Sequence, residues 1–359
     1  MKRNFHTFAY TKHLILMKRK ILFVLMMVIP AFTNAQEHGL VNLRIEARLD
    51  YMQEMRQGEN FNDNSGFKGR YLNIRMDGQL SEHFSYSYRQ RLNKPNKDIS
   101  FFDATDWIHL TYTNKNWSVS AGKQVVGIGG YEYDVAPIDL YIYSEYWGNI
   151  PCFRVGVSST YTTDDKNDKF MLQFCESPFR GHELNINNEQ MFAYNAVWYG
   201  THGIFSSIWS VNMMEYLPGK FMNYVALGNR LTLGQFQFDL DIMNRAVSTR
   251  NFFGKDMSFM SKFMWKPSDR FNLFLIATHD FNHADEIGDW SILPGTEITR
   301  VGAGLEYFPL KNSQDIRLHL NCSYADGVNT NPAGLLFPQQ TVVDAGVTWR
   351  MDLLKIKRK

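Results

Sequence analysis

The alternation of apolar and polar residues is the feature that most constrains the fold of this chain. In residues 41–51, VNLRIEARLDY, every odd position is apolar and every even position is polar. A period of two is typical of a β-strand with one apolar and one polar face. The same alternation returns in residues 72–80, 84–91, 235–242, 301–307, 316–320 and 343–349. The pattern predicts an all-β protein.

Sixteen strands are predicted from this pattern. They begin near residues 40, 67, 83, 105, 117, 152, 169, 191, 204, 221, 235, 257, 271, 299, 316 and 341. Short turns, such as 81–82, 114–116, 201–203 and 268–270, alternate with long loops at 54–66, 93–104, 125–151, 178–190, 246–256, 283–298 and 327–340. An even number of strands with short turns at one end and long loops at the other is the plan of an outer-membrane barrel. We therefore expect a transmembrane antiparallel β-barrel of about 16 strands with short periplasmic turns.

A soluble β-sandwich or propeller is the alternative fold, because it is also built from alternating strands. Two features favour the barrel. Aromatic residues near strand ends fit the girdle of a membrane interface, as in Trp117, Trp198, Trp209, Trp265 and Trp349. The polar faces carry many charges, which a water-filled interior tolerates better than a packed core does.

The N-terminus has the features of an export signal. A basic segment starts at Met17, an apolar run covers 21–32, and Thr33-Asn-Ala35 offers small residues for cleavage. We expect residues 1–35 to be a signal peptide, with Met17 as the start, and residues 36–359 to form a single barrel domain. A short anchoring helix is disfavoured because the apolar run is too short to span a bilayer. The expected location is the outer membrane of a Gram-negative (diderm) bacterium.

Composition excludes several other classes. The chain has 38 Lys and Arg against 36 Asp and Glu, so no basic excess points to nucleic acid. Three cysteines are too few to stabilise 359 residues by disulfide bonds, so a disulfide scaffold is excluded. The mean hydropathy is −0.33, and no segment after the export signal offers about 18 consecutive apolar residues. A helical membrane protein is thereby excluded, whereas a barrel is not.

The third long loop, VVGIGGYEYDVAPIDLYIYSEYWGNIP at 125–151, is predicted to be the functional element. Its density of apolar and aromatic residues requires a surface to pack against, and the inside of the barrel wall offers one. Gly127, Gly129 and Gly130 permit the sharp turn. We expect the loop to fold inward and narrow the pore. Its constriction residues are Glu132, Tyr133, Asp134, Asp139, Tyr141, Glu145, Tyr146 and Trp147.

The segments around this loop carry a family resemblance. The stretch from AGKQ at 121–124 to SEYWGNIP at 144–151 resembles the phosphate-selective porin O and P family, in particular its Bacteroidetes-type members. The resemblance implies a sixteen-stranded outer-membrane barrel, usually a homotrimer, with an inward third loop. It also implies a diffusion pore for small hydrophilic solutes, lined with Arg and Lys and favouring phosphate-type anions.

Strand parity predicts which charges line the pore. Thirteen bases point inward: Arg44, Arg48, Arg75, Arg89, Arg91, Arg154, Arg230, Arg245, Lys262, Lys266, Arg300, Arg317 and Arg350. Seven acids do so: Glu46, Asp50, Asp77, Asp239, Asp241, Glu306 and Asp344. A wall excess of 13 − 7 = +6 favours anions such as phosphate. The loop has four acids and no base, which reduces the excess to +2.

Two interpretations of the pore stay open. In one, the basic wall makes a filter for phosphate. In the other, the loop carboxylates pair with wall arginines and hold the loop, which leaves a general, weakly selective porin.

Other residues give no sign of catalysis, metal binding or a cofactor. The chain has no GxSxG, HExxH, paired CxxC or P-loop motif, and an enzyme or adhesin barrel is the minor alternative. His109 and His319 point inward on separate strands without metal-ligand spacing. Cys152 and Cys175 allow a cross-strand disulfide in principle, but two free thiols are favoured. Residues 351–359 are expected to be a solvated basic tail.

Overall fold

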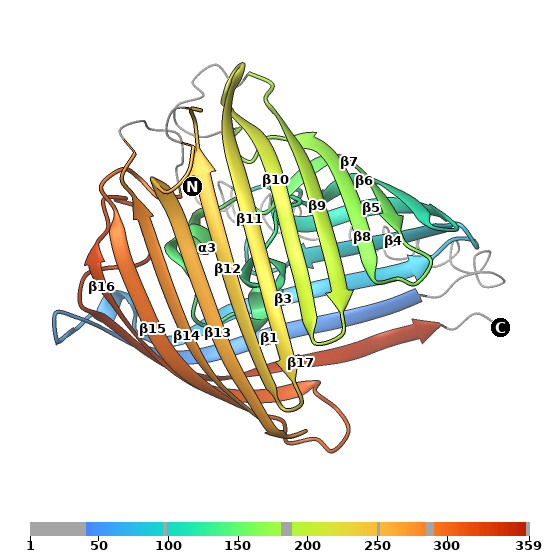
Figure 1. Cartoon of the computed structure of the whole chain (residues 1–359). Coiled ribbons are helices and arrows are strands. Elements are labelled where there is room, and N and C mark those ends of the chain that lie inside the picture. The colour runs from blue at the N-terminus through green and yellow to red at the C-terminus, as the bar shows by residue number, and fades with distance from the viewer. Residues whose placement is uncertain (1–40, 96–98, 181–188, 250–251, 285–290, 357–359) are drawn as a thin grey trace, which may run out of the picture.

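The computed structural model describes residues 41–95, 99–180, 189–249, 252–284 and 291–356. The predicted signal peptide, residues 1–35, lies outside this part of the chain. The described residues form one closed antiparallel β-barrel (Figure 1).

Sixteen long strands build the barrel wall. They are β1 (Val41–Arg56), β3 (Gly66–Gln79), β4 (Phe84–Arg91), β5 (Thr105–Asn114), β6 (Trp117–Val125), β7 (Phe153–Thr162), β8 (Asp168–Glu176), β9 (Phe192–His202), β10 (Phe205–Leu217), β11 (Lys220–Leu233), β12 (Phe236–Ala246), β13 (Asp256–Ser268), β14 (Phe271–Asn282), β15 (Glu297–Tyr307), β16 (Ile316–Val328) and β17 (Gln340–Ile356). A two-residue strand, β2 (Glu59–Asn60), pairs with the end of β1. Each long strand pairs with its sequence neighbours, and β1 also pairs with β17, which closes the ring. The sixteen-stranded barrel predicted from the alternation is confirmed.

The end of the chain differs from its prediction. Strand β17 continues to Ile356, and Ile356 pairs with Val41. Residues 351–356 are therefore part of the wall, and the expectation of a solvated tail from residue 351 is wrong for them. The reason is that the first residues of β1 need a partner on this side, because a barrel leaves no free strand edge.

The outer face has the character of a lipid-facing surface. Leu49, Leu172, Val211, Leu275 and Leu320 are 48–67% exposed along the middle of the wall. Five strands that follow a short turn begin with an exposed aromatic residue, namely Phe84, Trp117, Phe205, Phe236 and Phe271. Aromatic side chains at the ends of an apolar band are typical of a membrane–water interface.

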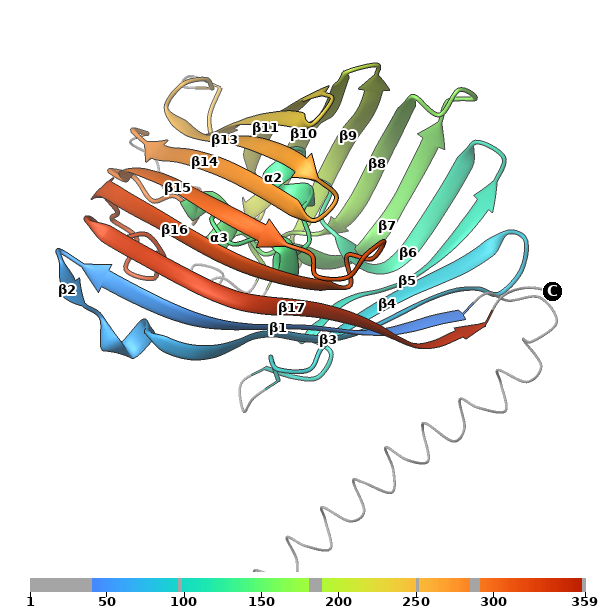
Figure 2. The same cartoon turned by 90° about the horizontal axis from the view of Figure 1, so that it is seen from below.

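Short helices occur in the loops. They are η1 (Asn62–Asn64), α2 (Tyr131–Asp134), η2 (Pro137–Asp139) and α3 (Glu145–Asn149). None of the helices in the described part of the chain is long and apolar enough to cross a membrane. Three of them, α2, η2 and α3, belong to residues 126–152, which we call the constriction loop. Figure 2, a view into the barrel, shows α2 and α3 inside the ring of strands.

The constriction loop supplies much of the buried core. Val126, Ile128, Tyr133 and Tyr146 form a cluster with wall residues such as Tyr224. Burial of this apolar surface explains why a loop of this composition leaves the solvent and packs inside the barrel.

Candidate functional site: the constriction loop and the inner wall

The first segment of the constriction loop lies flat against β8 to β12. Gln173 accepts a hydrogen bond from the Gly127 amide at 2.7 Å, and Ser210 Oγ accepts one from the Gly129 amide at 2.8 Å. A Cβ atom on Gly129 would lie 2.6 Å from the carbonyl oxygen of Ile208, and Gly130 has φ +109°. Glycine is therefore required here for close approach and for the turn.

Carboxylates of the wall accept hydrogen bonds from backbone amides in the first turn of both α-helices of the loop. Asp241 Oδ2 accepts a hydrogen bond from the Glu132 amide at 2.7 Å, and Asp280 Oδ2 accepts one from the Glu145 amide at 2.8 Å. An acceptor at these positions satisfies amides that have no partner within the helix. Asp241 and Asp280 are almost fully buried. Asp241, predicted as a lining charge, is thus used to bind the loop.

The middle of the loop is tied to the opposite wall by ion pairs. Asp139 Oδ1 lies 2.6 Å from Arg317 and 2.5 Å from Arg350. Arg48 donates a hydrogen bond to the Leu140 carbonyl at 2.7 Å. Burial acts to raise the pKa of Asp139, but Arg317 and Arg350 outweigh it and hold that pKa below its usual range. Asp139 pairs with wall arginines, as the second interpretation of the pore supposes.

The aromatic side chain of Tyr141 fills the space between these ion pairs. Its hydroxyl donates to Glu306 at 3.1 Å, and the Arg48 guanidinium lies 4.5 Å from its ring centre. The His319 ring is 4.4 Å away. Tyr141 therefore packs against three charged or titratable side chains of the wall, which fixes the loop across the pore.

The remaining loop acids differ in their surroundings. Glu145 is fully buried and accepts hydrogen bonds from the amides of Leu335 and Leu336. The Glu132 carboxylate accepts hydrogen bonds from the amide and hydroxyl of Ser144. Burial raises the pKa of Glu132 to about 8, because the Ser144 hydrogen bonds only partly oppose it. Asp134 is exposed, and its carboxylate makes no hydrogen bond or ion pair with any described residue.

Tyr133, Tyr146 and Trp147 pack within the loop and against the wall, and Tyr133 and Trp147 also line the larger cavity described below. Tyr133 and Tyr146 are buried, and the Tyr146 ring lies 6.0 Å from that of Tyr224. Trp147 is partly buried and contacts Tyr143.

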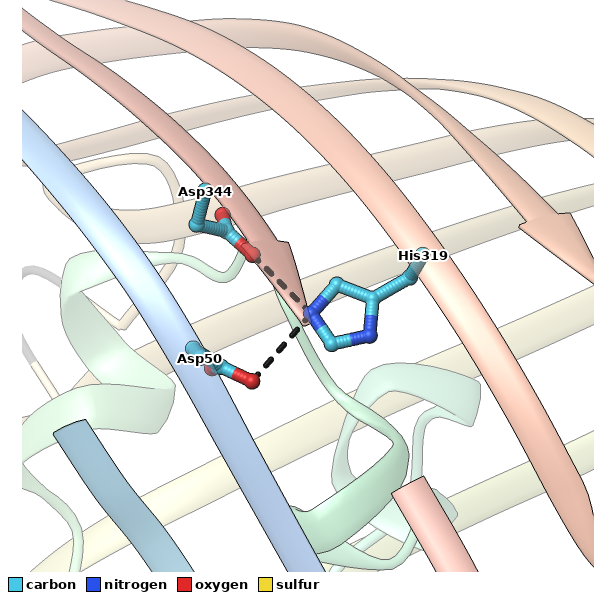
Figure 3. A group of neighbouring side chains, drawn as sticks. All are labelled: Asp50, His319 and Asp344. Carbon is cyan, nitrogen blue, oxygen red and sulfur yellow. Dashed lines mark ion pairs between the residues drawn. The ribbon is translucent and has the colours of Figure 1, made fainter. Parts of the chain in front are cut away.

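One group of wall residues has the composition of a metal site. His319 Nε2 lies 3.2 Å from Asp50 and 3.3 Å from Asp344, and all three side chains are buried (Figure 3). However, Arg48 lies 2.7 Å from Asp50, and Arg70 lies 3.5 Å from it. Two guanidinium groups already neutralise these carboxylates and would repel a cation. The arrangement fits an internal ion network better than a metal centre.

Most predicted lining arginines are paired with carboxylates. The pairs are Arg44 with Asp352, Arg75 with Asp77, Arg89 and Arg91 with Asp106, Arg230 with Asp239, and Arg245 with Asp256. Arg154 donates instead to the carbonyls of Ser177 and Pro178. Lys262 lies 4.9 Å from the ring centre of Phe274, and Lys266 is exposed near a short turn.

Several inward residues were missed by the parity argument. The pairing of β1 with β3 shifts after Arg48, so that Arg70 is left without a Cα partner there. Because of this bulge both Arg70 and Tyr71 reach the interior: Arg70 approaches Asp50, and Tyr71 lies 5.1 Å from the Arg91 guanidinium. The buried acids Glu54, Asp106, Asp256 and Asp280 lie near strand ends, beyond the clear alternation.

Two cavities lie on either side of the constriction loop. The first, of about 400 Å³, lies between the loop and the wall from β4 to β9, with Arg89, Trp107, His109 and Asp134 in its lining. The second, of about 210 Å³, lies between the loop and the wall from β15 through β17 to β3. The three cysteines Cys152, Cys175 and Cys322 are free, as favoured from the sequence.

Comparisons with known proteins agree with this geometry. The model of the phosphate-selective porin O and P family matches residues 41–209, which confirms the resemblance stated above. No curated protein sequence matches the chain.

Solved structures share its fold. The outer-membrane channel DcaP of Acinetobacter baumannii has 12% identity and a TM-score of 0.63 over 88% of this chain and 98% of that one. An anion-selective porin from Comamonas acidovorans has 10% identity and a TM-score of 0.61 over 88% and 100%. The trimer form of OmpT, an outer membrane protein of Vibrio cholerae, has 13% identity and a TM-score of 0.59 over 88% and 100%. Identities this low establish a shared fold.

Proposed function

Because residues 41–209 match the phosphate-selective porin O and P family, we propose that this chain is an outer-membrane porin. It forms a water-filled diffusion channel for small hydrophilic solutes, and the constriction loop sets the size limit. The inward fold of that loop carries the proposal. It crosses the interior between Asp241 on β12 and the Arg317–Arg350 pair on β16 and β17, and it leaves open space against the wall from β4 to β9.

A preference for anions is supported by two ion pairs of the wall, although at Asp139 the order is the opposite, with a side-chain exposure of 28% for the acid against 8% for Arg317 and 16% for Arg350. Side-chain exposure is 29% for Arg230 against 9% for Asp239, and 20% for Arg91 against 1% for Asp106. At these positions the guanidinium group faces the lumen and the carboxylate lies behind it. Such an arrangement attracts anions although the summed charge is nearly balanced. Arg44 and Asp352, at the short-turn end, are about equally exposed.

A general, weakly selective porin is the second candidate. It is favoured by the loop, which offers the exposed Asp134 and no basic residue. In this interpretation phosphate passes as one small anion among several. The channel then has no filter for it.

Reversal potentials in a planar bilayer distinguish the two. Purified protein is inserted and a KCl gradient is applied, after which phosphate is added to one side. We expect a chloride-biased reversal potential, and phosphate block at low concentration would indicate a true phosphate filter. An unselective reversal potential would support the general porin, and the absence of channels from folded protein would contradict the porin function.

Three further properties complete the proposal. The chain is exported by a cleaved signal peptide at residues 1–35 and placed in the outer membrane of a diderm bacterium. It assembles as a homotrimer, in line with its family and with the trimer form of the OmpT structure. It acts as a channel without catalysis, so no enzyme activity is expected.

A further inference from the structure

One buried arginine of the wall stands apart from the others. In the described part of the chain five arginines are less than 9% exposed: Arg48, Arg89, Arg245, Arg300 and Arg317. Four of them have a carboxylate oxygen within 2.6–2.8 Å. Arg300, on β15, has no ion pair with any described carboxylate. A buried guanidinium group is costly when its charge is not compensated.

The neutral partners of Arg300 compensate it poorly. Its Nη1 donates to the Tyr143 carbonyl and its Nη2 to Gln340 Oε1, both at 3.3 Å, whereas its Nε has no acceptor. Charge-assisted hydrogen bonds are normally about 2.7–2.9 Å long. Gln340 is also engaged elsewhere, because its Nε2 donates to Glu54 at 2.9 Å. Arg300 therefore keeps donor capacity that the described residues do not use.

Arg300 lines the smaller cavity, of about 210 Å³, together with Arg48, Arg70, Tyr71 and Tyr143. Asn64 and Leu335, from the first and last long loops, also line it, which places the cavity on the long-loop side of the constriction loop. We call it the Arg300 pocket.

The charge of the pocket suits a single negative charge. Its lining contains three arginines and one acid, Asp344. Asp50, just behind, lies 2.7 Å from Arg48 and 3.5 Å from Arg70. With Asp50 included, the three arginines exceed the two acids by one; Glu54 and Glu145 lie outside the lining, where they accept hydrogen bonds from Gln340 and from the Leu335 amide. The remaining lining combines the polar Asn64, Ser323 and Gln340 with the apolar or aromatic Met52, Leu140, Tyr141, Leu335 and Val342 and the two tyrosines.

We propose that the Arg300 pocket binds a small organic monocarboxylate, with Arg300 contacting the carboxylate and the tyrosine rings enclosing its apolar body. This inference rests on the proposed function, since the ligand is a solute that enters from the long-loop mouth of the channel. Inorganic phosphate fits less well, because it carries more charge than the pocket balances and has no apolar body.

Calorimetric titration of the folded, detergent-solubilised protein tests the site. The probes are benzoate, uncharged benzyl alcohol and inorganic phosphate. We expect benzoate to bind with a dissociation constant below about 1 mM, with phosphate and benzyl alcohol weaker. Arg300→Gln weakens benzoate at least tenfold, which corresponds to about 1.4 kcal/mol. Arg75→Gln is the control, because Arg75 lies outside the pocket and pairs with Asp77, and it changes benzoate affinity less than twofold.

A second variant distinguishes loss of the binding site from misfolding of Arg300→Gln. Leu335→Trp fills the pocket from the loop side without touching the guanidinium charge, and we expect the same loss of benzoate binding. Equal benzoate affinity in wild type and both variants overturns the site, as does phosphate binding more tightly than benzoate. Conductance in KCl without any probe tests the porin function separately. If the protein conducts but benzoate affinity is unchanged in both variants, the porin function stands and the proposed binding site is refuted.

Discussion

Asp139 is the loop residue whose removal should change the channel most. Its carboxylate connects the constriction loop to Arg317 and Arg350 on neighbouring strands. We expect Asp139→Asn to loosen the segment around η2, which then keeps the contacts of Arg48 with the Leu140 carbonyl and of Tyr141 with Glu306 on this side, and to add one unit of positive charge to the lumen. The loop remains attached on the β8–β12 side through Gly127, Gly129 and Asp241.

The magnitude follows from the contacts. A hydrogen bond to a charged group contributes about 1.5–3 kcal/mol, and breaking a buried ion pair costs about 3–5 kcal/mol. The loss is at the lower end here because Arg317 retains Glu306 at 3.2 Å and Arg350 retains Glu46 at 3.4 Å. We therefore expect about 3 kcal/mol, which raises the population of the detached segment about a hundredfold.

Single-channel recording measures both effects. Asp139→Asn should increase open-channel current noise and shift the reversal potential further toward chloride. Asp134→Asn is the matched control: Asp134 lies in the same loop and carries the same charge, but its carboxylate makes no hydrogen bond or ion pair with the described wall residues, so only the reversal potential should shift. Current noise in Asp139→Asn that equals that of Asp134→Asn would refute the role of the ion pairs.

The remaining predictions concern the loop's other contacts. Gly129→Ala places a methyl group 2.6 Å from the Ile208 carbonyl and should lift the loop and raise conductance, whereas Gly69→Ala, which meets only Leu49 at 3.9 Å, should leave conductance unchanged; equal conductance in both would contradict the close approach. Because the folded pKa of Glu132 is raised to about 8, its protonated form is the one the fold favours, so the stability it contributes is complete below about pH 4.5 and is lost as pH rises through about 8. Current noise should accordingly rise between about pH 5 and 8 in wild type, level off above pH 8, and stay flat in Glu132→Gln; the same rise in both would exclude Glu132 as the cause. For Asp139 the lowered pKa means that its contribution is lost only as pH falls below about 4, so noise should also rise under strong acid, and its absence in acid would contradict the ion-pair geometry.

The barrel was predictable from the sequence because the alternation of apolar and polar residues that identifies each strand lies within short, continuous segments. A strand with lipid on one side and water on the other has to alternate, as residues 41–51 do. The inward loop was predictable for a similar reason, since its apolar residues needed a surface. The alternation fails where the strand pairing shifts, and that is why Arg70 and Tyr71 were missed.

The pairing inside the barrel was not predictable, because it depends on distances between residues far apart in the chain. Asp139 meets Arg317, and Glu145 meets Leu336, across more than 170 positions. A count of inward charges assigns Asp241 and Arg317 to the lumen with equal weight. The structure uses both to bind the loop, so the summed wall charge says little about the field that a solute meets.

The account depends most on the claim that the constriction loop controls flow through an open barrel. The most direct measurement compares the single-channel conductance of wild type with that of a variant in which residues 131–147 are replaced by a short Gly-Ser linker. Heat-modifiable migration on gels shows that both barrels are folded. We predict a conductance several times higher in the variant and a weaker preference for small solutes in liposome swelling. Unchanged conductance in a folded variant would contradict the account.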